Sequence, residues 1–379
     1  MEGEAAERAR EEARLLPQGD AAWAAEPEPV AVIELVDREK PAPLWAWILL
    51  VFSVLAFTSS GVIFSMMPEV PSLTLASWRL QATSVLLIPA CALELAFWTP
   101  ADVRLRILRS MGLLAVNGAF LGLHFGLWVL SLQLTSLPHA MLFITMSPVF
   151  VALASWARGR PISRGELAGT ALGVAGGALL ALTSVHHGGG SERDPSWQGD
   201  ACALAGAGLF VLHLEMGRRL RGFTPMLTYS AVVTSIAAGL LVVGAVALEG
   251  SGLLGDRRGH ASFGVLQWLV DRRYIGMILM LAIVPGIVGH VGFNTIVKHI
   301  DSLVLTLASS VEPLLGSCIG YALGLVSAPP LLTYVGGFTV IASTIIVPIA
   351  GHARQQRAER LERLAAGKSQ NAMRTVELA

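Results

Sequence analysis

The chain has 379 residues, of which 54% are hydrophobic and only 14% are charged, and its mean hydropathy is +0.62. Because an ordinary soluble domain carries about 25% charged residues, this composition excludes such a fold and predicts a membrane protein. The formal net charge is +0, so the overall charge does not favour nucleic acid as a partner, and we expect none.

Long apolar runs separated by short charged clusters predict about ten membrane-spanning α-helices. A helix needs about 20 residues to cross the hydrocarbon core, whereas a β-barrel would show alternating segments of about ten residues. We therefore expect an all-α integral membrane protein that passes through the lipid bilayer about ten times. In chain order the predicted spans are residues 44–66, 73–98, 107–132, 137–157, 164–185, 199–220, 226–248, 274–297, 302–325 and 331–350.

The distribution of Lys and Arg predicts the orientation of these spans, since cytoplasmic loops are enriched in both residues. With the N-terminus inside, the basic clusters fall on the inner side, except for the loop at 249–273. We expect residues 1–43 to form a largely disordered cytosolic tail and residues 351–379 to form a second cytosolic tail. The plasma membrane and an endomembrane such as the vacuole or Golgi are all compatible with this pattern.

Similar residues recur in the two halves of the chain. Four features follow in the same order at an offset of 165 to 167 residues: His124 and His290, Ser136-Leu137 and Ser302-Leu303, Pro148 and Pro313, and Gly169 and Gly336. The recurrence predicts two copies of a five-helix unit, at 44–185 and 199–350, joined by a loop at 186–198. Because five is odd, the second copy must cross the membrane upside down. Inverted repeats of this kind build many secondary transporters, with the solute site near the midplane where the halves meet.

Several longer motifs lie along the predicted spans. They are Ala76-Ser77-Trp78-Arg79, Leu134-Thr135-Ser136, Met146-Ser147-Pro148-Val149-Phe150, Gly199-Asp200, Val311-Glu312-Pro313-Leu314-Leu315 and Tyr334-Val335-Gly336-Gly337-Phe338. In their order and spacing they resemble the EamA-type branch of the drug/metabolite transporter superfamily, over nearly the whole of 44–350. The resemblance implies a transporter of amino acids or other metabolites.

Glu312 is the leading candidate for a functional side chain, since it lies near the centre of the ninth predicted span. A charge at that depth costs roughly 2.5–3.5 kcal/mol on insertion scales, and it persists where it faces a cavity or a partner. The next residue, Pro313, frees a backbone carbonyl one turn earlier. We expect Glu312 either to bind a proton or a cationic group of the solute, or to stay protonated and hydrogen-bond a neighbouring helix.

Polar residues in the third and eighth predicted spans form a second candidate set. Asn117, His124 and Trp128 are seven and four residues apart, so they share one helical face. His290 and Asn294 are four residues apart and share a face of the corresponding helix. Histidine titrates near neutral pH, which suits coupling to protons. Hydrogen bonding between helices is the alternative role.

Arg79, Pro148 and Pro313 complete the candidate residues. Arg79 lies about two turns into the second predicted span, where it could bind an anionic group of the solute or extend to the lipid headgroups. Pro148 and Pro313 lie in paired helices, and they would act as hinges between the halves or as ordinary kinks.

These features favour a secondary transporter that moves a small metabolite, an amino acid or a similar polar or amphipathic solute, by alternating access. Protons are the candidate coupling ion. The sequence shows no phosphate-cradling loop, zinc cluster or nucleophile elbow, so we expect neither an enzyme nor a bound metal or cofactor. The alternatives are a nucleotide-sugar or organic-phosphate antiporter of the same superfamily, a membrane-embedded enzyme that acts on lipids, and a channel.

Overall fold

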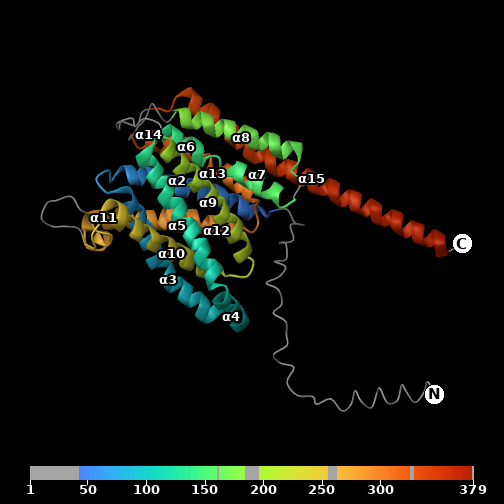
Figure 1. The fold of residues 1–379 in the computed structure, drawn as a ribbon, viewed down its shortest axis with the longest axis horizontal. Coiled ribbons are helices and arrows are strands. Elements are labelled where there is room, and N and C mark those ends of the chain that lie inside the picture. The colour runs from blue at the N-terminus through green and yellow to red at the C-terminus, as the bar shows by residue number, and fades with distance from the viewer. Residues whose placement is uncertain are drawn as a thin grey trace, which may run out of the picture. The chain divides into compact units, whose positions relative to one another are not determined.

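The computed structural model describes residues 42–135, 137–159, 162–183, 196–254, 263–324 and 328–377. Every named element within these ranges is a helix, and the helices form one bundle (Figure 1). The predicted all-α fold is thereby confirmed. The expected N-terminal tail lies almost entirely outside the described residues, as does most of the loop expected at 186–198.

The first half of the bundle contains seven α-helices and one π-helical segment within the described residues. They are α2 (Leu44–Ser65), α3 (Ser72–Leu93), η1 (Glu94–Trp98), α4 (Ala101–Arg109), α5 (Met111–Leu134), α6 (Leu137–Ile144), α7 (Ser147–Ala157) and α8 (Arg164–Thr183).

The second half contains seven α-helices, one 3₁₀-helix and one π-helical segment within the described residues. Its elements are α9 (Trp197–Leu220), α10 (Met226–Glu249), η3 (Gln267–Leu269), α11 (Arg272–Leu281), η4 (Ala282–Val291), α12 (Gly292–Ile296), α13 (Ser302–Ser309), α14 (Glu312–Ala322) and α15 (Leu331–Glu377).

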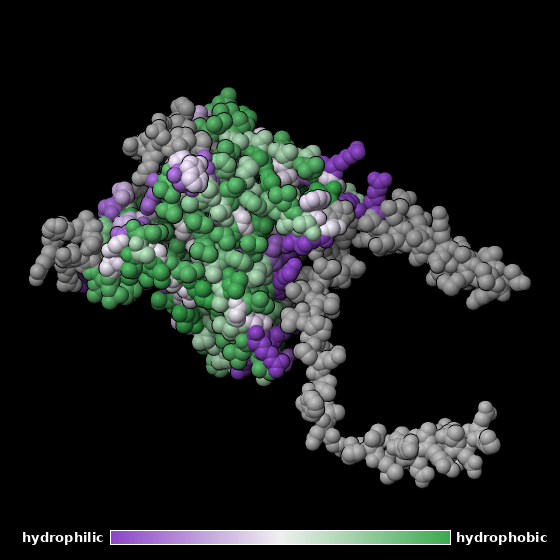
Figure 2. Space-filling model, in the orientation of Figure 1, coloured by the Kyte–Doolittle hydropathy of each residue, from purple (hydrophilic) through white to green (hydrophobic). Residues whose placement is uncertain are grey.

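Nine helical stretches of described residues are long and apolar enough to cross a membrane. The 20-residue helix α8 occupies the position of the fifth predicted span, so the expected number of about ten spans agrees with the structure. Figure 2 shows one face of the bundle, where hydrophobic residues cover most of the surface and hydrophilic residues gather at its edges. Large apolar side chains such as Phe52, which is 59% exposed, are stable on such a surface only against lipid or another apolar partner.

Two elements differ from the sequence prediction. The third span was expected to begin at residue 107, but α4 forms a separate short helix, and α5 begins at Met111. Arg104, Arg106 and Arg109 all lie in α4, so this helix is too highly charged to continue into the hydrocarbon core. The tenth span was expected to end at residue 350, close to the end of the apolar stretch Leu331–Arg354, and the difference is that α15 continues without a break to Glu377.

The helices pair across the two halves of the chain. α3 packs on α10, α8 packs on α15, α5 packs on α9, and α2 packs on η4. This is the pairing that two inverted five-helix copies related by a two-fold axis would give, because the second and fifth helices of one copy then meet their own counterparts. The approach of α8 to α15 is especially close, since a Cβ placed on Gly176 would lie 2.8 Å from the carbonyl oxygen of Gly336.

The α3–α10 pair is joined by two reciprocal helix caps. Each helix follows a proline, which provides no side-chain cap for its first turn. Glu249, at the end of α10, accepts hydrogen bonds from the backbone N–H groups of Leu73 (2.7 Å) and Thr74 (2.8 Å) at the start of α3. It also accepts one from the Thr74 hydroxyl (2.8 Å). An acid at this position satisfies first-turn N–H groups and complements the positive end of the helix dipole.

The second cap runs in the opposite direction. Glu94, where α3 passes into η1, accepts hydrogen bonds from the N–H groups of Leu227 (3.3 Å) and Thr228 (2.7 Å), and from the Thr228 hydroxyl (2.8 Å). The donors thus occupy the same helix positions at the start of α10 as Leu73 and Thr74 occupy at the start of α3. Each helix therefore supplies the cap that the other lacks.

Candidate solute site

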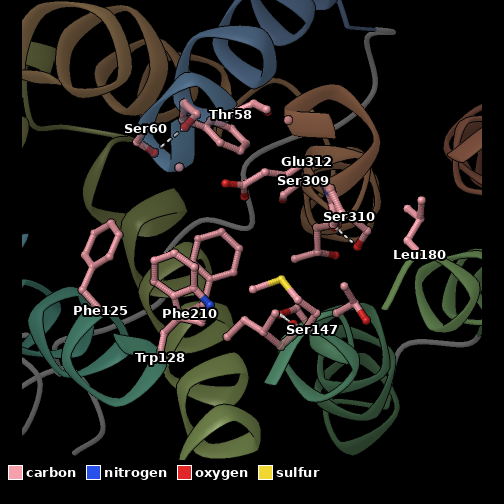
Figure 3. Close-up of a pocket in the computed structure, with 18 of the residues that line it drawn as sticks. Thr58, Ser60, Phe125, Trp128, Ser147, Leu180, Phe210, Ser309, Ser310 and Glu312 are labelled. Carbon is pink, nitrogen blue, oxygen red and sulfur yellow. Dashed lines mark hydrogen bonds between the residues drawn. The ribbon is translucent and has the colours of Figure 1, made fainter. Parts of the chain in front are cut away.

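A cavity of about 440 Å³ lies inside the bundle and is lined by both halves of the chain. Figure 3 shows Glu312 pointing into the space that Phe210 and Trp128 border on the other side. A cavity of this size matches the lower range of small-molecule sites. Six of the nine residues predicted from the sequence line it: Arg79, His124, Trp128, His290, Glu312 and Pro313.

Two broken helices bring equivalent positions to the cavity wall. α6 stops at Ile144 and α13 stops at Ser309, and the next helices, α7 and α14, begin at Ser147 and Glu312. Pro148 and Pro313 are the second residues of these helices, where the missing N–H of proline leaves no hydrogen bond unmade. Pro313 lines the cavity with Glu312, whereas in the first half Ser147 lines it and Pro148 does not.

Glu312 occupies the first residue of α14 and is partly exposed to the cavity. The N-terminus of a helix carries a partial positive charge, which stabilises an ionised carboxylate. The carboxylate also interacts electrostatically with Arg79 on the opposite half of the chain. Glu312 can therefore hold a proton or a cationic group of a solute between the two halves.

His124 presents a hydrogen-bond acceptor to the cavity when its ring is neutral. Its Nδ1 lies 2.9 Å from the backbone oxygen of Gly206 on α9. A carbonyl oxygen only accepts, so Nδ1 carries the hydrogen and Nε2 keeps its lone pair. The ring stacks on Phe210, with centroids 4.9 Å apart.

His290 reaches the cavity from a π-helical segment. Pro285, inside η4, has no N–H to donate to the backbone hydrogen bonds of the helix. The turns of a π-helix are wider than those of an α-helix, and π-helical segments are frequent at functional sites. The His290 ring lies between Phe57 (5.8 Å) and Phe125 (5.5 Å), measured between ring centroids. The two histidines that recur in the sequence thus face the same cavity from opposite halves.

Arg79 is buried at the cavity wall and does not extend to the lipid headgroups. Its side chain lines the cavity, and the residue is only 3% exposed. The guanidinium carbon lies 5.5 Å from the centre of the Phe125 ring, within the range of a cation–π contact. Arg79 is therefore placed where it could meet a solute, and its role stays a prediction.

Asn117 and Asn294 lie away from the cavity, in contacts between helices. The Asn117 amide donates a 2.7 Å hydrogen bond to the Tyr229 hydroxyl on α10. The backbone oxygen of Asn294 accepts one from Arg221 (3.2 Å). Both residues are buried, and neither is brought to the cavity wall.

Several residues of the wall carried no recognisable signal in the sequence. The aromatic side chains of Phe57, Phe210 and Phe293 and the hydroxyls of Thr58 and Ser310 line the cavity. Phenylalanine and threonine also occur throughout the lipid-facing and packed parts of the spans, so residue type alone does not mark them. Ser147 could have been found, because it precedes Pro148 as Glu312 precedes Pro313.

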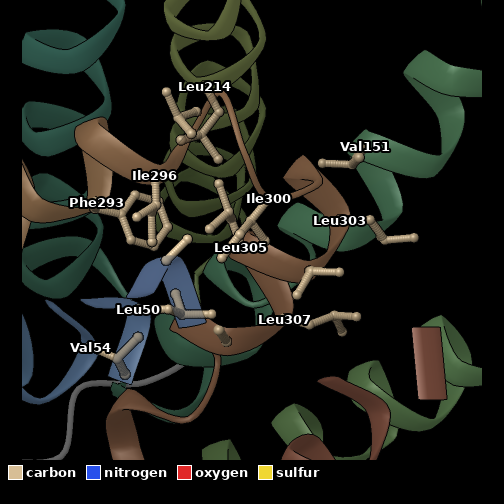
Figure 4. Packing of buried hydrophobic residues seen from close by; sticks show 14 of the residues in the cluster. Leu50, Val54, Val151, Leu214, Phe293, Ile296, Ile300, Leu303, Leu305 and Leu307 are labelled. Carbon is tan, nitrogen blue, oxygen red and sulfur yellow. The ribbon is translucent and has the colours of Figure 1, made fainter. Parts of the chain in front are cut away.

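The cavity reaches only one end of the bundle. Its wall extends to Val62 near the end of α2, Gly320 near the end of α14, and Thr333 near the start of α15. The opposite end is filled by a cluster of buried apolar residues (Figure 4). We call it the sealing cluster; it includes Ala46, Leu50, Val151, Leu214, Phe293, Ile296, Val297, Ile300, Leu303, Val304 and Leu307.

Arg218 braces this sealed end. Its Nη2 donates hydrogen bonds to the backbone oxygen of Ile300 (2.8 Å) and to the Ser302 hydroxyl (2.6 Å). These bonds tie the last turn of α9, the first helix of the second half, to the turn between α12 and α13. A charged donor buried with neutral acceptors makes stronger hydrogen bonds than a neutral donor would.

Comparison with known proteins agrees with this architecture. Residues 44–182 match the model of the EamA-like transporter family. This part of the chain is therefore similar to the EamA-like transporters. The match confirms the resemblance inferred from the motifs for these residues. No curated protein matches the chain.

The chain also shares its fold with solved structures, of which 29 chains match. One of them, a crystal structure described only as a protein, superposes with a TM-score of 0.61 at 17% identity. The alignment covers 80% of this protein and 98% of that chain. The shared fold therefore includes both halves of the bundle. Within the described residues, no group of three or more His, Cys, Asp or Glu is placed to hold a metal ion.

Proposed function

We propose that this protein is a secondary transporter of the EamA-like type that moves a small amphipathic metabolite by alternating access, with amino acids as the leading candidates. In this proposal both termini are cytosolic and the two five-helix units move relative to each other around the central cavity. The observation that carries it is a cavity that has walls from both halves, reaches one end of the bundle and is closed at the other.

The sealing cluster supports a reversible gate. It is built where α2, α12 and α13 meet, and the helix breaks at Ser310–Val311 and Thr145–Met146 lie between this cluster and the wide end of the cavity. Movement at the two breaks would separate the apolar surfaces at one end while closing the wall at the other. Pro148 and Pro313, next to the breaks, would act as the hinges.

The chemistry of the wall fits an amphipathic solute. Phe57, Phe125 and Phe210 provide apolar and aromatic surface, which is favourable for an apolar body. Glu312 and the Nε2 of His124 provide acceptors for an ammonium or hydroxyl group. Glu312 is also where a transported proton would bind, which gives proton coupling a defined site.

The first experiment tests Glu312. Purified wild type and Glu312→Gln are reconstituted into proteoliposomes, and uptake of a panel of amino acids is measured with and without a pH gradient. We expect the variant to insert and fold normally but to lose uptake or its dependence on the gradient. Glu215→Gln, which changes an acid paired with Arg158 (3.0 Å) outside the cavity, is the control and should transport normally. Full accumulation by Glu312→Gln would remove this residue from the mechanism.

The second experiment tests alternating access. Cys91, Cys202 and Cys318 are replaced, and a single cysteine is placed either at Ser317 in the cavity or at Leu303 in the sealing cluster. An impermeant maleimide should label the first position from one side of the membrane and the second from the other, and a transported solute should change the two rates in opposite directions. Labelling of both positions from one side, with flux that does not saturate, would indicate a channel instead. Recovery of a chemically altered solute would indicate an enzyme.

A further inference from the structure

The unpartnered atoms of Arg79 lie along one edge of its guanidinium. Nε and Nη2 are buried and have no hydrogen-bond partner in the described part of the chain. These two nitrogens point their hydrogens in the same direction and form the edge that binds the two oxygens of a carboxylate at once. The missing partner is therefore defined in shape as well as in charge.

Leaving such a group unpaired is unfavourable. A buried donor without an acceptor costs about 1–3 kcal/mol, and more when the group is charged. Glu312 interacts with Arg79 electrostatically, but no hydrogen bond joins them, and the ring of Phe125 takes only one face of the guanidinium. Arg79 lines the wall of the cavity, so a solute bound there is the candidate for the missing acceptor.

The balance of charge in the cavity favours a carboxylate over a phosphate. Arg79 is the sole Lys or Arg among the described residues that line the wall, and Glu312 is the sole acid. A phosphate carries up to two negative charges and three strong acceptor oxygens, which one arginine facing one glutamate does not satisfy. A single carboxylate matches one bidentate edge.

We infer that the transported solute carries a carboxylate, which binds edge-on to Arg79, and that Arg79 determines this specificity. The inference rests on the proposed function, since it assigns the solute class of the same cavity. The apolar body of the solute lies against Phe125 and Phe210, and the end opposite the carboxylate faces Glu312. Organic phosphates are thereby excluded as the preferred solutes.

Binding of four matched probes tests this assignment without any transport. Phenylpropionate, phenylalanine, phenethylamine and phenyl phosphate share a phenyl ring but differ in charged groups. Each is titrated into the purified full chain in nanodiscs, and heat release is measured. We expect the two carboxylates to bind and phenethylamine and phenyl phosphate to bind at least about tenfold more weakly. Equal binding of all four, or tighter binding of the amine or the phosphate, would overturn the inference.

Variants then locate the carboxylate. Arg79→Gln should weaken phenylpropionate by about tenfold to a hundredfold, and Arg79→Lys, which keeps the charge but not the edge, should recover only part of that loss. Arg106→Gln is the matched control, because Arg106 also lies over a phenylalanine ring (4.4 Å from the centre of Phe223) but does not line the cavity. Unchanged binding in a well-folded Arg79→Gln would also refute the assignment.

The wild-type probe series decides the question even if Arg79→Gln does not fold. The two proposals also fail separately. Selective carboxylate binding in a protein that does not transport would contradict alternating access and leave Arg79 as a carboxylate site. Saturable transport without any preference for carboxylates would contradict the role of Arg79 and leave the transport mechanism standing.

Discussion

Replacing Glu249 by alanine removes the cap at the start of α3 and tests whether the two halves depend on each other. The carboxylate accepts three hydrogen bonds of 2.7 to 2.8 Å from Leu73 and Thr74. The preceding Pro71 makes no side-chain cap, so within the described structure no other group replaces the lost acceptor. We expect Glu249→Ala to lower the free energy of unfolding.

The size of the loss follows from two contributions. Removing an N-terminal cap costs about 0.5–2 kcal/mol, and removing an acid from the positive end of a helix costs about 0.3–1 kcal/mol. Three short bonds to one carboxylate place Glu249 toward the upper part of these ranges, so we expect a loss of about 2–3 kcal/mol. Glu249→Gln keeps an acceptor but not the charge and should lose about 1 kcal/mol. Glu94→Ala should resemble Glu249→Ala, because it removes the equivalent cap from α10.

Unfolding by dodecyl sulfate in dodecyl maltoside micelles measures these differences. Glu215→Ala is the control, since it breaks a partly exposed ion pair with Arg158, and such pairs contribute at most about 1 kcal/mol. If Glu249→Ala is no less stable than this control, the carboxylate does not act as a cap. If Glu94→Ala and Glu249→Ala differ by more than about 2 kcal/mol, the two caps are not equivalent.

Three further predictions concern packing, the sealed end and pH. Gly176→Val should destabilise the protein by about 1–3 kcal/mol, because its Cβ would lie 2.8 Å from a carbonyl oxygen of α15. Gly239→Ala is the control, since a Cβ at that position meets nothing within 4 Å. In the same micellar unfolding assay it should be neutral or slightly stabilising. Arg218→Gln should loosen the turn between α12 and α13, which faster maleimide labelling of a cysteine at Leu303 would show. Burial lowers the pKa of His299, and the positive charges of Lys298 and Arg221 lower it further. The unfolded chain therefore binds a proton at this histidine more tightly than the folded protein does. Stability is then complete above the unfolded pKa of about 6.5 and falls as the pH drops through it, and unfolding measured between pH 7 and 5 should show a smaller loss for His299→Gln.

The spans could be predicted because the bilayer imposes a simple rule on sequence. Each crossing needs an apolar run of a fixed length, and α2, α9 and α10 follow the predicted limits within a few residues. The end of α15 could not be predicted in this way. Hydropathy falls where a helix leaves the lipid, but a helix does not have to stop there, and α15 continues into its charged segment.

The sequence singled out those cavity residues whose type is rare inside a membrane. Glu312 and Arg79 were recognisable because a charge in hydrocarbon needs a reason, and both face the cavity. Helical spacing was less informative for Asn117, since it shows which residues share a face but not which neighbour that face meets. Asn117 and His124 share a face of α5, yet the first meets Tyr229 on α10 and the second meets the cavity.

The helix caps were missed although a signal is present. Pro71 and Pro225 each begin the same pattern, proline followed at the second and third positions by leucine and threonine. The pattern indicates two equivalent helix starts without a cap of their own. Which acids complete them depends on the antiparallel contact between α3 and α10, and that contact is a property of the folded bundle.

The reciprocal caps also bear on how the protein is made. When α3 leaves the ribosome, the acid that completes its first turn has not been synthesised, because Glu249 follows Thr74 by 175 residues. Until α10 enters the membrane, the exposed amides of α3 must be satisfied by water or lipid headgroups at the surface. Neither half can reach its final form alone, so nascent chains stalled before the seventh span should remain open to quality-control proteases.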